Sequence, residues 1–281
     1  MSTLYAVRLR AVVFTLIGFA AFLTVAQATH SWGGYHWART ANPFTLKLGD
    51  NLTTAAWKSH LAQTSSDWNS GNSAILTAIV AGQSRKRCST VAGTTQVCDG
   101  NYGNNGWLGL ATIYITGGVH ITQGSAKMND TYFNTATYNN PNEREHVMCQ
   151  EVAHTFGLDH QSTDGSSQNS CMDYFSNTGA NAGSTVSTKP NAHDFQELNS
   201  IYAHFDSYTT LATTTSKSAA AEDDGDDPNS WGMLVSQSHN GRSSTYEAYN
   251  RDGSKKATHV FWTSEAAAKC PGCDHRYDNG H

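Results

Sequence analysis

The most informative stretch of this chain is Gln150-Glu-Val-Ala-His154-Thr-Phe-Gly157-Leu-Asp-His160. Side chains four positions apart lie on the same face of a helix, so Gln150 and His154 project together. Glu151 is adjacent and can reach a metal-bound water. Gly157 lets the chain turn sharply, which brings His160 back towards His154. We therefore expect Gln150, His154 and His160 to bind one metal ion and to leave a position open for water, as in a catalytic zinc site.

The helix that carries this stretch has a clear predicted start and end. Asn140 can cap it, Pro141 fits its first position, and Glu143 stands where a capping-box acid would. Gly157 provides a natural stop. The pattern predicts a helix that begins after Asn140 and ends just before Gly157.

A second motif follows at a fixed distance. The segment Ser170-Cys-Met-Asp-Tyr174 places Met172 twelve residues after His160. Together the two segments resemble the metzincin zinc peptidases, whose signature H-E-x-x-H-x-x-G-x-x-H is followed by a methionine turn. The order of the flanking elements resembles the matrixin branch over roughly residues 43–206.

The resemblance implies a role for each matching residue. Zinc would be the cofactor, and Glu151 would act as general base on the zinc-bound water. Met172 would form a hydrophobic floor under the metal, and Tyr174 would steady the oxyanion as in the astacin and serralysin branches. The family also makes structural calcium possible, with no ligand set that we would name.

The match departs from the family at the first ligand, which is Gln150 instead of histidine. A neutral amide oxygen is a weaker zinc donor than imidazole. His146 is one turn earlier, but it lies eight residues from His154, about 12 Å along a helix. Both could bind one zinc only if the helix were broken, so we expect Gln150 to act as a weak or water-bridged ligand.

The fold class expected is α/β (α+β). It comprises a metzincin-like twisted mixed sheet, an active-site helix, a Met-turn and a C-terminal helix, plus a small β appendage. Strands are expected at 44–48, 74–80 and 108–121, the last interrupted at Gly117-Gly118. Helices are expected after Thr53 or Thr54 and over about 192–205. Residues 29–210 would form this metallopeptidase domain.

The rest of the chain has a different character. Residues 211–230 are rich in Thr, Ser, Ala and acids, and are expected to be a linker. Residues 231–281 are expected to hold a small β-meander and a cysteine-containing tail. Asn240-Gly241 and Asp252-Gly253 are the hairpin signals between its strands. Such a thin unit would pack on the main domain.

Residues 1–28 read as a signal peptide, with Arg8 and Arg10 before an apolar stretch and Ala26-Gln27-Ala28 as the cleavage pattern. We therefore expect a secreted, extracellular protein with no membrane association after cleavage. The net charge of −5 argues against nucleic-acid binding, and the mean hydropathy of −0.49 fits a globular chain. We expect a monomer.

All six cysteines follow residue 28, and an even count in an exported chain favours disulfides. Six cysteines allow 15 pairings, so the sequence leaves the connectivity open. The candidate pairs are Cys88 with Cys98, Cys149 with Cys171, and Cys270 with Cys273; the alternative for Cys149 and Cys171 is that each pairs elsewhere or stays free. The second would join the site helix to the turn at Met172. A second metal at Cys270, Cys273 and His275 is the alternative to an oxidised C-x-x-C.

The function expected is a secreted zinc-dependent metalloendopeptidase acting on a protein or peptide substrate. Substrate would add as a strand to a sheet edge, for which we select the 120–128 segment. The alternative is a catalytically weakened pseudopeptidase that binds extracellular proteins, motivated by Gln150. Retention of Glu151 argues against a pure binder. A third hypothesis, a secreted polysaccharide-binding module, is supported only by the aromatic residues that such a module could expose.

Overall fold

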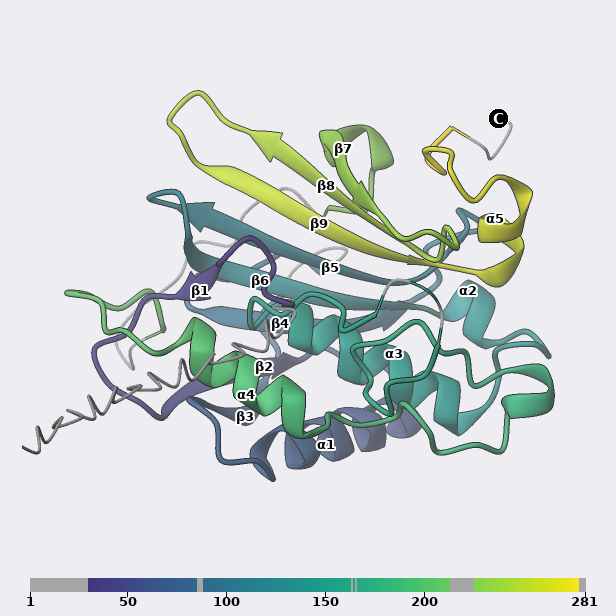
Figure 1. The fold of residues 1–281 in the computed structure, drawn as a ribbon, viewed down its shortest axis with the longest axis horizontal. Helices are drawn as coiled ribbons and strands as arrows, with labels where there is room; N and C mark the ends of the chain where they lie inside the picture. Colours follow the sequence, from purple (N-terminus) through teal and green to yellow (C-terminus); the bar gives the residue numbers. More distant parts are fainter. Residues whose placement is uncertain (1–29, 85–87, 163, 165, 213–224, 278–281) are drawn as a thin grey trace, which may run out of the picture.

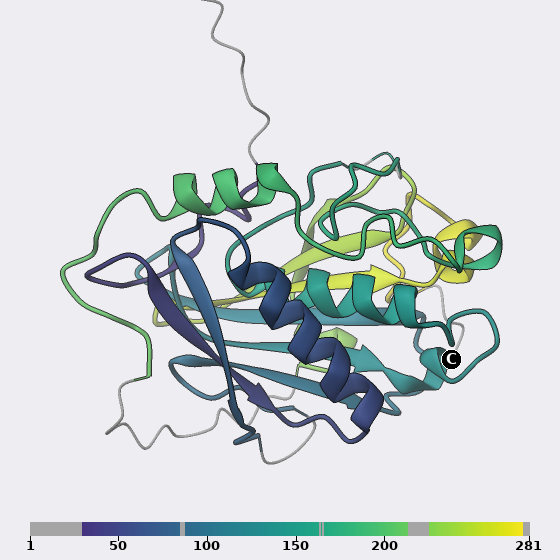
Figure 2. The same cartoon turned by 90° about the horizontal axis from the view of Figure 1, so that it is seen from below.

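The computed structural model describes residues 30–84, 88–162, 164, 166–212 and 225–277. They form a mixed α/β structure in which one sheet is covered on one face by helices (Figures 1 and 2). The expected fold class is confirmed. The proposed signal peptide, and residues 213–224 of the proposed linker, lie outside the described residues.

The sheet has nine strands in the described ranges, in the order β3-β2-β4-β6-β5-β9-β8-β7, with β1 paired to β6. The strands are β1 His36–Trp37, β2 Phe44–Asp50, β3 Ile75–Ala81, β4 Thr94–Gly100, β5 Trp107–Thr116, β6 His120–Asn129, β7 Met233–Gln237, β8 Ser243–Tyr249 and β9 Lys255–Trp262. The helices are α1 Ala55–Asn69, α2 Asp130–Phe133, α3 Pro141–His154, α4 Ala192–Ile201 and α5 Ser264–Lys269, with 3-10 turns at Gly179–Asn181 and Pro228–Ser230.

The sheet is parallel on one side and antiparallel on the other. Strands β3, β2, β4 and β6 run parallel, and β5 runs antiparallel to β6. Strand β6 therefore has a partner on each side. The expectation that the 120–128 segment is a sheet edge is wrong, because the hairpin at Gly117-Gly118 adds β5 beside it.

The C-terminal meander continues this sheet. Strand β9 pairs antiparallel with β5, β8 with β9, and β7 with β8. The turns at Asn240-Gly241 and Asp252-Gly253 form where expected, with positive φ at both glycines. A three-stranded unit buries little alone, so pairing with β5 gives it a large sheet to pack with.

Two apolar clusters hold the layers together. The larger lies between the sheet and the helices, where α3 contacts α1, β5 and β6. The smaller packs the opposite face of the C-terminal strands; its buried members are Trp107, Leu110, Trp231, Tyr246, Val260, Trp262 and Ala266. Since Trp107 and Leu110 belong to β5, this second cluster fixes the C-terminal strands to the rest of the molecule.

The three candidate disulfides are present: Cys88–Cys98, Cys149–Cys171 and Cys270–Cys273. The alternative of a metal at the C-x-x-C is therefore excluded in this oxidised state, and His275 instead lies 3.0 Å from the Gly241 carbonyl oxygen. No helix within the described residues has the length and apolar character needed to cross a bilayer.

Candidate metal centre

Helix α3 and the loop that follows it place two of the histidines. Asn140 caps the helix by accepting a hydrogen bond from the Glu143 amide, as the sequence predicts. The helix ends at His154, and Gly157 follows with φ of +94°. A Cβ at Gly157 would lie 1.9 Å from the Tyr35 carbonyl oxygen, so only glycine allows this turn. The turn returns the chain so that His160 lies beside His154.

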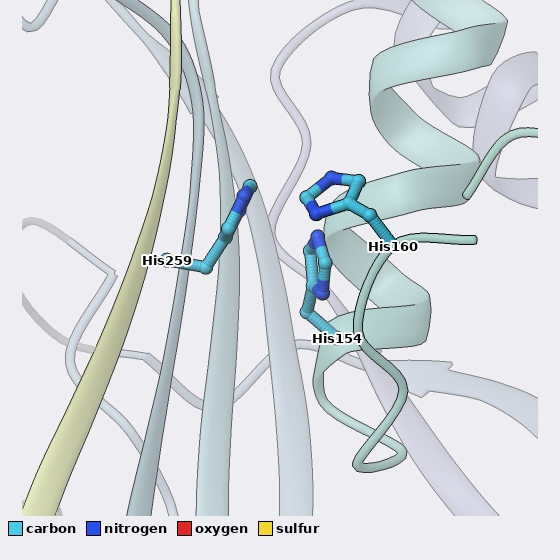
Figure 3. A group of neighbouring side chains, drawn as sticks. All are labelled: His154, His160 and His259. Carbon is cyan, nitrogen blue, oxygen red and sulfur yellow. The ribbon is translucent and has the colours of Figure 1, made fainter. Parts of the chain in front are cut away.

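Three imidazole rings meet at the end of α3 (Figure 3). They belong to His154, to His160 and to His259 of β9, and one ligand nitrogen from each lies within 4.8 Å of the others. The ring centroids are 3.8 Å apart for His154 and His259, and 4.7 Å apart for His154 and His160. All three side chains are buried. Three imidazoles are a ligand set of catalytic zinc sites.

Each ring is oriented through its Nδ1 atom. His154 Nδ1 lies 2.8 Å from the Leu158 carbonyl oxygen, which fixes Nδ1 as the donor. His160 Nδ1 lies 2.7 Å from the Tyr174 hydroxyl, and His259 Nδ1 lies 3.2 Å from Glu151 Oε2. The Nε2 atoms of all three rings are buried and have no hydrogen-bond partner. A hydrogen-bonded Nδ1 with a bare Nε2 is the arrangement seen in metal-bound histidines.

Burial sets the charge of these groups. It lowers the pKa of His154 and His160 well below the usual range, and the neighbouring histidines add to this effect. Burial also lowers the pKa of His259 to about 3. The three rings are therefore neutral at neutral pH, which is the form that binds a metal. Burial raises the pKa of Glu151 to about 8, against the opposing effect of His154 and His146.

Glu151 lies against β5 and beside His259. A Cβ on Gly109 of β5 would come within 2.6 Å of Glu151 Oε1, so the missing side chain at Gly109 provides the space for this carboxyl. Glu151 Oε1 is buried and has no hydrogen-bond partner. The carboxyl therefore presents one oxygen to His259 and leaves the other without a partner.

Gln150 is held by its side-chain amide nitrogen. Its Nε2 atom donates to the carbonyl oxygens of Cys171, at 2.9 Å, and Asp173, at 2.8 Å. Its Oε1 atom is buried without a partner. Gln150 thus fastens α3 to the Met172 turn beside the Cys149–Cys171 disulfide. Its role as a metal ligand stays a prediction.

The other expected residues surround this centre. Met172 is fully buried within the turn. Tyr174 stacks against His160 with ring centroids 4.0 Å apart, and its hydroxyl lies 2.6 Å from Ser243 Oγ. Tyr174 therefore orients His160 here, and its oxyanion role stays a prediction. His146 Nε2 lies 3.2 Å from the Asp173 carbonyl oxygen, outside the histidine group.

Sequence reasoning missed His259. It lies in a predicted strand among apolar residues, and a single histidine in a strand has no ligand spacing to mark it. Only the antiparallel pairing of β9 with β5, opposite Ala111, brings it to Glu151.

No protein-family model matches this chain, and no curated protein is significantly similar to it.

Proposed function

We propose that this chain is a secreted zinc-dependent metalloendopeptidase related to the metzincins. The observation that carries the proposal is the meeting of three buried imidazoles whose Nε2 atoms have no partner, one of which, His259, is in contact with the Glu151 carboxyl. Neutral imidazoles without partners lose the hydrogen bonds that water would give them, and a cation bound between them restores that interaction. The three disulfides fit an oxidising, extracellular location.

The donor set fits zinc. His154 and His160 would hold it, with His259 as the third nitrogen in the state described here. Zinc, when bound, supplies Lewis acidity that lowers the pKa of a water molecule and polarises a carbonyl group. A bound cation would also offset the burial that raises the pKa of Glu151, and so favour its carboxylate form.

The protein's own side chains would transfer the proton, orient the histidine rings and exclude water. Glu151 takes the proton of the attacking water on its free oxygen and returns it to the leaving amine. Leu158, Tyr174 and Glu151 keep the three rings in position through their contacts with the Nδ1 atoms. The apolar surroundings of Met172 exclude bulk water from the centre.

The first test is zinc content together with peptide hydrolysis, in wild type and in Glu151→Gln. We expect Glu151→Gln to keep its zinc and to lose about 10²- to 10⁴-fold of kcat/KM, the usual contribution of a general base. The matched control is Glu145→Gln. Glu145 lies on the same helix but contacts His60 and Thr64, so its replacement should leave hydrolysis near the wild-type rate. Equal activity of wild type and Glu151→Gln would exclude this function.

The pseudopeptidase is the second candidate, and one observation favours it. Glu151 and His154 are 0% and 1% exposed, so a substrate does not reach the centre in this state. A zinc-loaded protein that hydrolyses no peptide, in wild type or in variants that loosen β9, would favour that candidate.

A further inference from the structure

A second histidine cluster lies at another place in the fold, where β1, the start of β6 and the segment after α4 meet. It consists of His36, His120, His204 and Asp206. His36 is buried, His120 and Asp206 are half-buried, and His204 is exposed. None of these residues belongs to the centre described above.

The spacing of three donors in this surface cluster is that of a metal site. The Nε2 atoms of His204 and His36 are 3.1 Å apart, and each lies 3.7 Å from Asp206 Oδ1. Two ligands bound tetrahedrally at zinc distances of 2.0–2.1 Å are separated by about 3.3 Å. The triangle formed by the three donors therefore needs changes of only a few tenths of an ångström to hold a cation.

Neighbouring groups orient these donors. His36 Nδ1 lies 2.9 Å from the Gly34 carbonyl oxygen, so Nδ1 carries the proton, and in a neutral ring Nε2 is left as an acceptor near His204 and Asp206. Arg39 holds the other carboxylate oxygen of Asp206 at 3.0 Å, which leaves Oδ1 for the cluster. His120 Nε2 lies 3.1 Å from Oδ1 and its Nδ1 lies 2.7 Å from the Tyr208 hydroxyl. Such outer contacts fix ligand geometry.

We propose that His36, His204 and Asp206 bind a second divalent cation of the zinc class, with its fourth position open to water. Two imidazoles and a carboxylate suit zinc better than calcium or magnesium, which take oxygen ligands. The site joins the segment after α4 to β1, so its role is to fasten the chain beyond the last helix of the main domain.

Zinc binding to metal-free protein tests this site. We expect wild type to take up about two zinc ions per chain, one for each histidine cluster, and His204→Ala to take up about one. The His204→Ala variant should retain peptide hydrolysis, because His204 is remote from Glu151. His204 is exposed, so its truncation should leave the fold intact. The control is His239→Ala, an exposed histidine outside both clusters.

The outcomes separate the two centres. Removal of a ligand should weaken the second site by more than about 100-fold, since loss of even an outer partner costs about 10- to 100-fold. One zinc per wild-type chain, or identical zinc uptake by wild type and His204→Ala, would overturn the second site without affecting the proposed peptidase.

A different observation concerns β9, the strand that closes the histidine centre. Strand β5 has β6 on one side and β9 on the other, with Gly109 opposite Phe261 and Ala111 opposite His259. Without β9, the β5 edge would be free. An unpaired strand edge is a ready template for an extended peptide.

The β5 edge passes directly along the centre. Glu151 lies against Gly109, and the residue opposite Ala111 reaches the Glu151 carboxyl from β9. An extended peptide paired antiparallel with β5 would therefore carry its backbone past Glu151 and His154, where β9 runs now. His259 is the side chain of β9 that enters the metal position.

We infer, on the basis of the proposed peptidase function, that β9 occupies the binding site of an extended peptide substrate and that His259 occupies the position of the substrate carbonyl or water. The substrate pairs with β5 through its main chain once β9 has been displaced.

Hydrolysis by Val260→Ala at saturating zinc tests this inference, because this variant keeps His259 and trims the packing of β9. We expect kcat/KM to rise at least about tenfold over wild type, the effect of removing about 1.4 kcal/mol of preference for the closed state. Val97→Ala, the same truncation at a buried position of β4, is the matched control.

Three results are informative. A rise that requires Glu151 supports the inference. Unchanged or reduced hydrolysis in Val260→Ala, with zinc bound and Glu151-dependent activity in wild type, would overturn the inference and leave the peptidase in place. Absence of hydrolysis in every zinc-loaded variant would exclude the peptidase itself.

Discussion

The two histidine clusters are built from similar groups but stand in different surroundings. In the buried cluster, His154 and His259 are each 1% exposed, and the three Nε2 atoms have no partner. In the surface cluster, the His204 side chain is 52% exposed, and the donors contact each other and Asp206. A buried cluster has no water to replace a missing cation, whereas the surface cluster does. We therefore expect the buried cluster to depend more strongly on its metal and on the backbone that shapes it.

The largest effect should come from the turn that forms the buried cluster. In Gly157→Ala, the new Cβ would approach the Tyr35 carbonyl oxygen and occupy a left-handed backbone conformation. We expect the free energy of unfolding to fall by about 3 kcal/mol or more, since both a clash and backbone strain are introduced. Urea unfolding measures this loss.

Gly118→Ala separates the two causes. Gly118 has φ of +85°, but no atom lies within 4 Å of the position of a new Cβ. Its replacement should cost only the backbone term of about 1–2 kcal/mol. Equal losses in the two variants would mean that the approach to Tyr35 has no effect, and the buried cluster would not depend on its turn in the way proposed.

The next effect compares a tyrosine at each cluster. Tyr174→Phe removes the hydroxyl beside His160 Nδ1, and we expect zinc affinity at the buried cluster to fall about 10- to 100-fold. Tyr208→Phe removes the hydroxyl beside His120 Nδ1, and His120 contacts Asp206 and the His36 ring but is not one of the three proposed ligands. The loss there should be smaller. Competition with a chromogenic chelator measures both. A larger loss in Tyr208→Phe would reverse the ranking of the two clusters.

The sequence specified the local parts of the buried cluster and left out its long-range part. Asn140, Gly157 and the spacing of His154 and His160 could be interpreted because caps, turns and helix faces depend on neighbours in the chain. Position and parity also indicated the three cysteine pairs as candidates, although the connectivity stayed open. His259 could not be found, because its place depends on which strand pairs with β5.

The surface cluster was missed for the same reason. His36, His120 and the His204–Asp206 segment are far apart in the chain, and each looks like an ordinary polar residue. Their meeting depends on β1 pairing with β6 and on the segment after α4 returning to β1, where the Asp206 amide donates to the Arg39 carbonyl oxygen. Sheet order is a global property, so neither the edge strand nor these contacts could be read from local patterns.

The smallest effect concerns a carboxyl away from both clusters, and it is needed to interpret their pH dependence. Burial, together with the neighbouring Asp99 carboxyl, raises the pKa of Asp130 to about 6 from its ordinary value of 3.8. The folded protein therefore holds this proton where the unfolded chain has lost it. The contribution to stability is full below about pH 4 and is lost as the pH rises through about 6.

Asp130→Asn should remove this dependence. The new side-chain amide can still accept the hydrogen bond from Trp57 Nε1, at 2.8 Å in wild type, and carries no charge beside Asp99. We expect metal-free Asp130→Asn to be more stable than wild type by about 1–2 kcal/mol at pH 7, and by less at pH 4, because the residue is only partly shielded from solvent. Asp252→Asn, at an exposed carboxyl whose pKa is lowered by hydrogen bonds from Ser254, should leave the curve parallel to wild type over this range. If wild type and Asp130→Asn gave parallel curves of unfolding free energy against pH, Asp130 would not cause the pH dependence above about pH 4. That dependence would then be assigned to the two histidine clusters.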